Sequence, residues 1–108
     1  MDIPALQRLL EQGRDSALLR FGLGKALLDA GDTEEAVIHL QRCVAQDPQY
    51  SAGWKWLGKA HLAAGDPDAA AQAWHQGRSV AETNGDKQAV KEMAVFLRRL
   101  QKASAGPA

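Results

Sequence analysis

The chain has 108 residues, and its thirteen Lys and Arg residues balance thirteen Asp and Glu residues. This length suits one domain with one core, and the zero net charge excludes a general electrostatic attraction of the whole protein to nucleic acid or to an anionic membrane. The single cysteine, Cys43, cannot form an internal disulfide. The start Met1-Asp2-Ile3-Pro4 lacks the features of a secretory signal. No apolar run reaches the roughly twenty residues that span a bilayer. A soluble protein in the reducing cytoplasm is therefore expected.

Apolar residues recur at helical spacing in six successive segments of the chain. Helix-forming residues such as Ala, Leu, Gln, Arg and Lys dominate, and β-branched residues are sparse, which favours helices over strands. The predicted helices cover roughly residues 3–12, 16–30, 33–46, 50–64, 67–83 and 87–102. Residues 103–108 are predicted to form a disordered tail.

The breaks between these segments carry turn and capping residues. Gly31 and Gly65 suit the left-handed conformation that closes a helix, and the residues that follow them, Asp32 and Asp66, can cap the next helix. Glu35 lies three residues after Asp32, as in a capping box. These signals predict two hairpins, each made of a helix, a tight turn and a second helix.

The two hairpins repeat each other when the chain is shifted by 34 residues. Leu23-Gly24-Lys25-Ala26 then falls on Leu57-Gly58-Lys59-Ala60, Gly31-Asp32 on Gly65-Asp66, and Ala36 on Ala70. A single hairpin cannot bury its apolar face alone, so neighbouring hairpins are expected to share one core. Glycine inside a helix costs about 1 kcal/mol relative to alanine, which predicts close helix crossings at Gly24 and Gly58.

This pattern resembles the tetratricopeptide repeat, which reads W-x2-L-G-x2-Y, then A-x3-F, then P. The second unit supplies Trp54, Leu57, Gly58, His61, Ala70 and Trp74, and the first supplies Leu23, Gly24, Leu27, Ala36, Leu40 and Pro48. The departures are Arg20 for the first aromatic residue, His61 for the tyrosine and Glu82 for the second proline. The resemblance implies an all-α fold, a short right-handed solenoid of stacked antiparallel helix hairpins with about six helices, in a single domain over residues 1–102.

Half-repeats are expected on both sides of the two whole repeats. Leu6 lies one period before Leu40, so the first predicted helix matches the second helix of a repeat unit. The last predicted helix matches the first helix of a unit, because Val90, Met93, Ala94 and Leu97 repeat the spacing of Trp54, Leu57, Gly58 and His61, 36 residues later. In this last helix, Phe96 and Leu100 stand where the first helix of each whole repeat has alanine, at Ala26 and Ala30 and at Ala60 and Ala64. They either seal an end that no further repeat covers or stay partly exposed and form a dimer contact.

No catalytic or metal-binding pattern is present in the sequence. His39, His61 and His75 have no partner at ligand spacing, and none of the common hydrolase, zinc or nucleotide-binding motifs occurs. His61 is expected in the core or at the edge of a groove, and the other two histidines in solvent. Cys43 falls at a small core site, which predicts a buried, inert thiol. The protein is therefore predicted not to be an enzyme and to hold no cofactor or metal.

The family resemblance implies a concave inner surface that takes extended peptides or helices of partner proteins. Its positions on the three first helices are Leu18, Phe21, Lys25 and Leu28; Ala52, Lys55, Lys59 and Leu62; and Gln88, Lys91, Val95 and Arg98. Five of these twelve residues are cationic and none is acidic, with Asp29 at the rim as the nearest counter-charge. We therefore expect an acidic segment with apolar anchors to bind there, through Phe21, Lys25, Lys55, Trp56, Lys59, Lys91, Val95 and Arg98.

Other interpretations of the same residues remain open at this point. The lysines can be the solvated side of their helices, or the protein can be a structural subunit that associates through the ends of the solenoid, although a monomer is expected first. Nucleic-acid binding lacks the strongly basic domain that it needs. One family variant clamps a terminal carboxylate with Lys, Asn, Asn, Lys and Arg, and that mechanism is not expected because the matching positions hold Phe21, Lys25, Trp56, Gln88 and Glu92.

Overall fold

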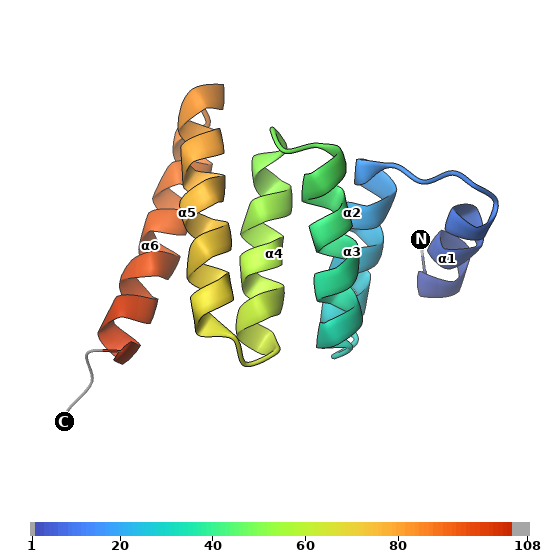
Figure 1. The fold of residues 1–108 in the computed structure, drawn as a ribbon, viewed down its shortest axis with the longest axis horizontal. Helices are drawn as coiled ribbons and strands as arrows, with labels where there is room; N and C mark the ends of the chain where they lie inside the picture. Colours follow the sequence, from blue (N-terminus) through green and yellow to red (C-terminus); the bar gives the residue numbers. More distant parts are fainter. Residues whose placement is uncertain (1, 105–108) are drawn as a thin grey trace.

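The computed structural model describes residues 2–104, which form six α-helices and no strand (Figure 1). The helices are α1 (Ile3–Glu11), α2 (Ala17–Asp29), α3 (Thr33–Gln46), α4 (Ser51–Ala63), α5 (Pro67–Asn84) and α6 (Lys87–Ser104). Every helix end lies within two residues of its predicted position. Helix α6 takes in the first two residues of the predicted tail, and residues 105–108 of that tail lie outside the described residues.

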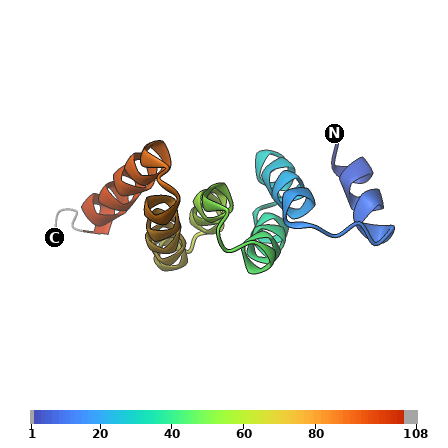
Figure 2. The ribbon, with the colours of Figure 1, turned by 90° about the horizontal axis from the view of Figure 1, so that it is seen from above.

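The helices form an elongated stack, 50 × 32 × 19 Å along its principal axes. Helices α2 and α3 make one hairpin and α4 and α5 the next, with α1 and α6 as single helices at the two ends (Figure 2). Helix α2 contacts α4 and α4 contacts α6, whereas no Cα atom of α3 lies within 8 Å of one in α5. The stack therefore curves toward α2, α4 and α6, which line its concave face.

Two core clusters support this stacking: one extends from α1 through both hairpins, and the other joins α5 to α6. Leu23 and Leu57, which are one period apart, are both buried, with exposed fractions of 0% and 4%. The predicted helix crossings are also present, because a methyl group added at Gly24 would overlap Leu40, and one at Gly58 would overlap the indole of Trp74. The 34-residue period is confirmed as a repeat of structural environments.

The turns between paired helices follow the predicted chemistry with one exception. Gly31 and Gly65 have φ angles of +85° and +86°, the left-handed conformation expected after a helix. Asp66 caps α5 by accepting a hydrogen bond from the Ala69 N–H, but Asp32 makes no such bond to α3. The capping box is absent as well, because the Asp32 N–H already donates to the Leu27 carbonyl and is not free for Glu35.

Arg20, at the position of Trp54 in the next repeat, closes the first hairpin with polar contacts. Its guanidinium donates to the Asp15 carboxylate at 2.8 and 2.9 Å, and Gln46 donates to the same carboxylate. A third guanidinium nitrogen lies 3.0 Å from Nδ1 of His39. His39 is consequently buried, and its predicted placement in solvent is wrong; His75 is exposed as predicted.

Phe96 and Leu100 lie on the side of α6 that faces the preceding hairpin. The Phe96 ring centroid is 5.0 Å from that of Trp74 in α5, and Leu100 packs against the same cluster. In α2 and α4, one side of the helix packs against the second helix of the same hairpin. The corresponding residues of α6 have no such helix to cover them, and they are partly exposed: Val90, Ala94 and Leu97. Phe96 therefore contributes to the concave face instead of covering the open end.

Candidate functional site

The concave face carries a row of alternating aromatic and cationic side chains, made by Phe21, Lys25, Trp56, Lys59 and Phe96. The Lys25 ammonium lies 5.2 Å from the ring centroid of Phe21 and 4.7 Å from that of Trp56. The Lys59 ammonium lies 4.4 Å from Trp56 and 5.2 Å from Phe96. These distances are within the roughly 6 Å at which a cation is attracted to an aromatic face. The cation–aromatic row thus runs across α2, α4 and α6.

The repeat explains how the row forms. Lys25 and Lys59 occupy equivalent positions 34 residues apart, so stacking places them at the same height on α2 and α4. Phe21 precedes Lys25 by four residues and Trp56 precedes Lys59 by three, spacings that put each pair on one face of its helix. The sequence-predicted residues Phe21, Lys25, Trp56 and Lys59 therefore come together.

The lysines of the concave face differ in their electrostatic partners. Lys55 Nζ lies 3.4 Å from Oε2 of Glu92. The nearest counter-charge is therefore Glu92, and the sequence-based expectation that it would be Asp29 is wrong. Among residues 2–104, no carboxylate lies within 4.0 Å of the ammonium of Lys25 or Lys59. The sequence placed Glu92 at an inner position that corresponds to Trp56, 36 residues earlier, but did not indicate that it would pair with Lys55. The free positive charge of the site therefore comes from Lys25 and Lys59.

The remaining predicted residues, on α6, contribute neither a ring nor an ammonium group to the row. Lys91 and Arg98 are exposed, and Lys91 borders a hollow at the α5–α6 turn with Glu82 and Asp86. Val95 is half-buried. One residue step rotates a side chain by about 100° around a helix, so the arginine that faces α4 is Arg99 and not its neighbour Arg98.

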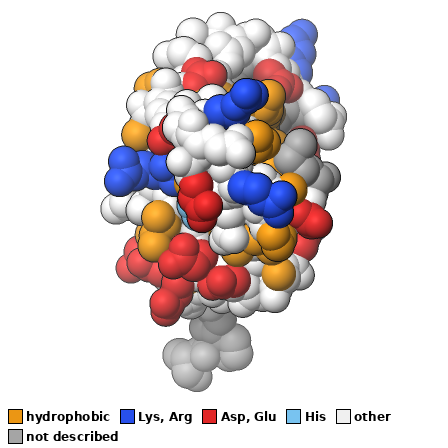
Figure 3. All heavy atoms as spheres, turned by 90° about the vertical axis from the view of Figure 1, so that its right-hand side faces the viewer, with side chains coloured by type: hydrophobic (Ala, Val, Ile, Leu, Met, Phe, Trp, Pro, Cys, Tyr) orange, Lys and Arg blue, Asp and Glu red, His pale blue; other side chains and the backbone are white. Residues whose placement is uncertain are grey.

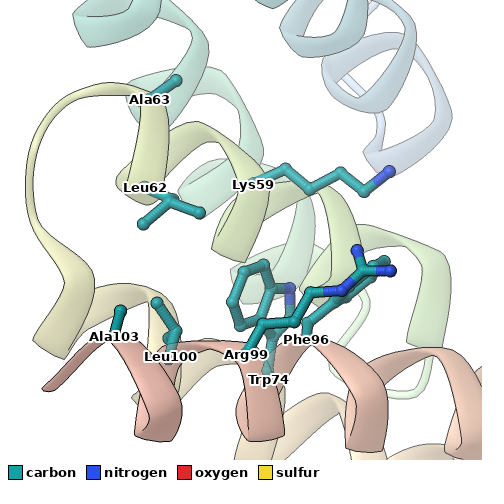
Figure 4. Close-up of a pocket in the computed structure, with 8 residues that line it drawn as sticks. All are labelled: Lys59, Leu62, Ala63, Trp74, Phe96, Arg99, Leu100 and Ala103. Atoms are coloured by element: carbon teal, nitrogen blue, oxygen red, sulfur yellow. The ribbon is translucent and has the colours of Figure 1, made fainter. Parts of the chain in front are cut away.

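A pocket of about 610 Å³ opens at the α6 end of the row, between α4, α5 and α6 (Figure 4). Its lining residues are Lys59, Leu62, Ala63, Trp74, Phe96, Arg99, Leu100 and Ala103. Trp74 is held in place by a hydrogen bond from its Nε1–H to the Lys55 carbonyl, at 2.9 Å. The pocket shares Lys59 and Phe96 with the cation–aromatic row, so the two are one continuous surface.

Exposed apolar side chains extend this surface. Leu18, in the first turn of α2, is 72% exposed, and Leu62, beside the pocket, is 43% exposed. Large apolar side chains left in water on one face are typical of a binding surface. The third large exposed apolar residue among those described, Ile38, lies on α3 and not on a concave-face helix.

Charge is distributed unevenly along the stack. Residues 87–108 contain five Lys and Arg and one Glu, whereas residues 1–50 contain five Lys and Arg and eight Asp and Glu. Figure 3 shows the α1 end of the molecule, where acidic side chains gather in the lower part of the view. The pocket therefore lies at the basic end of a neutral protein.

The other reactive side chains are placed for packing. Cys43 is fully buried, and burial raises the pKa of its thiol to about 11, which keeps it in the unreactive protonated form at neutral pH. Within residues 2–104, no three His, Cys, Asp or Glu side chains are grouped so that they could bind a metal ion. In the same range, none of the helices combines the length and apolar character that crossing a membrane requires.

This fold and surface define a class of protein, the helical-repeat proteins with a concave face. Comparisons with known proteins assign the family. The tetratricopeptide repeat model matches residues 27–84. The chain is 65% identical over 103 residues to TPR repeat-containing protein PA0015 of Pseudomonas aeruginosa, a match that covers 95% of this chain and 98% of that protein. The chain belongs to the tetratricopeptide repeat family, whose members generally act as protein–protein interaction modules.

Two solved structures agree with this assignment. The solution structure of protein BPP2914 from Bordetella parapertussis is 45% identical and has a TM-score of 0.83, covering 95% of this chain and 90% of that one. The crystal structure of MamA has a TM-score of 0.68 at 19% identity, covering 95% of this chain and 68% of that one. The second likeness concerns the fold alone.

Proposed function

We propose that this protein is a cytoplasmic, non-enzymatic adaptor whose concave face binds an acidic segment of a partner protein that also carries apolar anchors. The observation that carries this proposal is the cation–aromatic row, in which the ammonium groups of Lys25 and Lys59 are held between aromatic rings with no carboxylate partner among the described residues. An incoming carboxylate would supply the missing counter-charge, and the rings beside it would supply contact area.

The magnitudes indicate how the binding energy would be divided. An exposed ion pair contributes roughly 0–1 kcal/mol, so two lysines alone would hold a segment only weakly. Burying one large apolar side chain contributes about 1.5–3 kcal/mol more. Together with backbone contacts, these contributions suit an affinity on the order of micromolar. The apolar surface at Leu18, Trp56 and Leu62 is therefore as necessary to the proposal as the charge.

The proposal is tested with the double variant Lys25→Glu, Lys59→Glu. These lysines are a sharper choice than Lys55, whose charge Glu92 already balances. The matched control is Arg42→Glu, Arg78→Glu, which makes the same change of charge at exposed positions on α3 and α5. Fluorescence anisotropy with labelled acidic peptides, and capture of partners from cells, would measure the effect.

We expect the concave-face variant to lose about tenfold or more in peptide affinity, and the control to lose less than about twofold. Thermal melting of both variants establishes that the folded fraction is unchanged. Equal binding by wild type and the concave-face variant, at unchanged melting temperature, would rule out the basic concave face as the binding site.

A further inference from the structure

We infer that the pocket between α4, α5 and α6 is an anchor site for one bulky apolar side chain of the partner, with the partner's acidic residues running from there toward α2. This inference rests on the proposed function and goes beyond it, because it places the two halves of the ligand at opposite ends of the concave face. It also adds Trp74, Arg99 and Leu100 to the binding surface.

The pocket depends on a large residue at a position where the other repeats have a small one. Phe96 corresponds to Ala60, 36 residues earlier, and to Ala26, a further 34 residues earlier. Ala60 is fully buried in the core. The Phe96 ring instead lies on Trp74, with 5.0 Å between the centroids, and both rings border the pocket between α4 and α6 (Figure 4). The anchor site is thus a feature of the last helix and not of the repeat in general.

The chemistry of the pocket restricts what it can hold. Six of its eight lining residues have apolar side chains, and the other two are the cations Lys59 and Arg99. It contains no acidic, amide or hydroxyl side chain, so its charged groups are the donors of Lys59 and Arg99, which favour an anionic group beside the apolar surface. A leucine or aromatic side chain next to a carboxylate matches both parts of this lining. Its volume of about 610 Å³ lies in the range of small-molecule sites, which leaves ample room for one such side chain.

The continuity of the pocket with the row gives the order of the ligand's parts. Lys59 borders the pocket and also lies 4.4 Å from the Trp56 centroid, while Lys25 of α2 lies 4.7 Å from the same centroid. The two ammonium groups are therefore separated by no more than the sum of these distances. Carboxylates two residues apart in an extended segment are about 7 Å apart, which suits this spacing. A segment anchored in the pocket can thus present one carboxylate to Lys59 and the next to Lys25.

The probes for this inference are two fluorescein-labelled peptides of about a dozen residues. The first carries one phenylalanine followed by glutamates at alternate positions, and the second has serine in place of the phenylalanine. On the wild-type protein we expect the phenylalanine peptide to bind about tenfold more tightly in anisotropy titrations. Equal affinities for the two peptides would overturn the anchor site.

Two neighbouring arginines on α6 provide the matched variants. Arg99 borders the pocket, whereas Arg98 is equally cationic and exposed but does not. We expect Arg99→Glu to weaken the phenylalanine peptide about fivefold and Arg98→Glu to weaken it less than about twofold. Equal effects of the two changes would mean that only the general charge of α6 matters, which contradicts the inference. Circular dichroism confirms that both variants are folded.

The position of the anchor is measured directly by intermolecular nuclear Overhauser effects from the peptide's phenylalanine ring. The inference requires contacts with the methyl groups of Leu62 and Leu100. Contacts with Leu18, which is 72% exposed at the other end of the concave face, would reverse the order and overturn it. If the anchor fails but Lys25→Glu, Lys59→Glu still weakens both peptides, the proposed function survives. If that variant has no effect either, both ideas fail.

Discussion

The two hairpins of the stack have the same backbone design and different chemistry at equivalent positions. The first hairpin has Arg20 and Leu40 where the second has Trp54 and Trp74. Arg20 joins a cluster of ionic and polar hydrogen bonds with Asp15, whereas Trp54 packs on the core and donates one hydrogen bond to the Pro48 carbonyl. A position in the repeat therefore specifies a place in the stack without specifying the interaction that fills it.

A second consequence of this comparison concerns function. In the second hairpin, Trp74 is both a core residue, 2% exposed, and part of the pocket lining, and its partner Phe96 ends the cation–aromatic row. Leu40, its counterpart, is fully buried and does not border the pocket. In the second hairpin, one side chain thus serves both the core and the lining of the pocket, whereas its counterpart in the first hairpin serves the core alone.

The largest expected effect comes from truncating the two equivalent anchors. Trp74→Ala should lower the free energy of unfolding by about 3–5 kcal/mol, because it empties a buried site and removes the hydrogen bond from the indole to the Lys55 carbonyl. Leu40→Ala should cost less, at about 2–4 kcal/mol. Urea denaturation followed by circular dichroism measures both. An equal or larger loss for Leu40→Ala would contradict the expectation that Trp74 contributes more to stability than its counterpart.

An intermediate effect is expected from the two glycines at the helix crossings. Gly58→Ala should destabilise the protein by about 1–3 kcal/mol, because the added methyl meets the rigid indole of Trp74. Gly24→Ala meets the side chain of Leu40, which can shift more readily, and alanine recovers about 1 kcal/mol of helix propensity. We therefore expect a smaller loss at Gly24, measured by the same denaturation. A larger loss at Gly24 would contradict this account of the crossings.

The smallest expected effect is a pH dependence that originates in both hairpins. Burial lowers the pKa of His39, with help from the Arg20 guanidinium, and burial also lowers the pKa of His61. Because both folded-state pKa values lie below the unfolded value of about 6.5, the folded protein binds fewer protons in that interval. Their contribution to stability is complete above about pH 6.5 and decreases as the pH falls through the folded pKa values.

The measurement is the free energy of unfolding at several pH values from about 7.5 down to about 5. His39→Gln, in the first hairpin, should reduce the dependence of the free energy of unfolding on pH. His61→Gln, in the second hairpin, should do the same. A slope that neither change alters would contradict the assignment. Asp15 acts at lower pH, because the bonds from Arg20 and Gln46 hold its pKa well below 3.8, so its contribution is lost only in stronger acid.

Much of the candidate site could be read from the repeat. Phe21, Lys25, Trp56 and Lys59 lie on helices whose phase the 34-residue period defines, and all four belong to the cation–aromatic row. The α6 side of the site could not be read in this way. The period changes to 36 residues there, and Phe96 stands where an alanine is expected, so neither the pocket nor Arg99 follows from the pattern.

The sequence alone determined the helices, their pairing into hairpins and the buried apolar positions of the repeat, because helix formation and capping depend on residues only a few places apart and the repeat carries that pattern along the chain. Only the tertiary structure decided that Lys55 pairs with Glu92, that His39 is buried beside Arg20, and that Arg99 borders a pocket. These contacts join separate helices. They depend on the rotation and crossing of each helix, which a one-residue change in phase alters by about 100°.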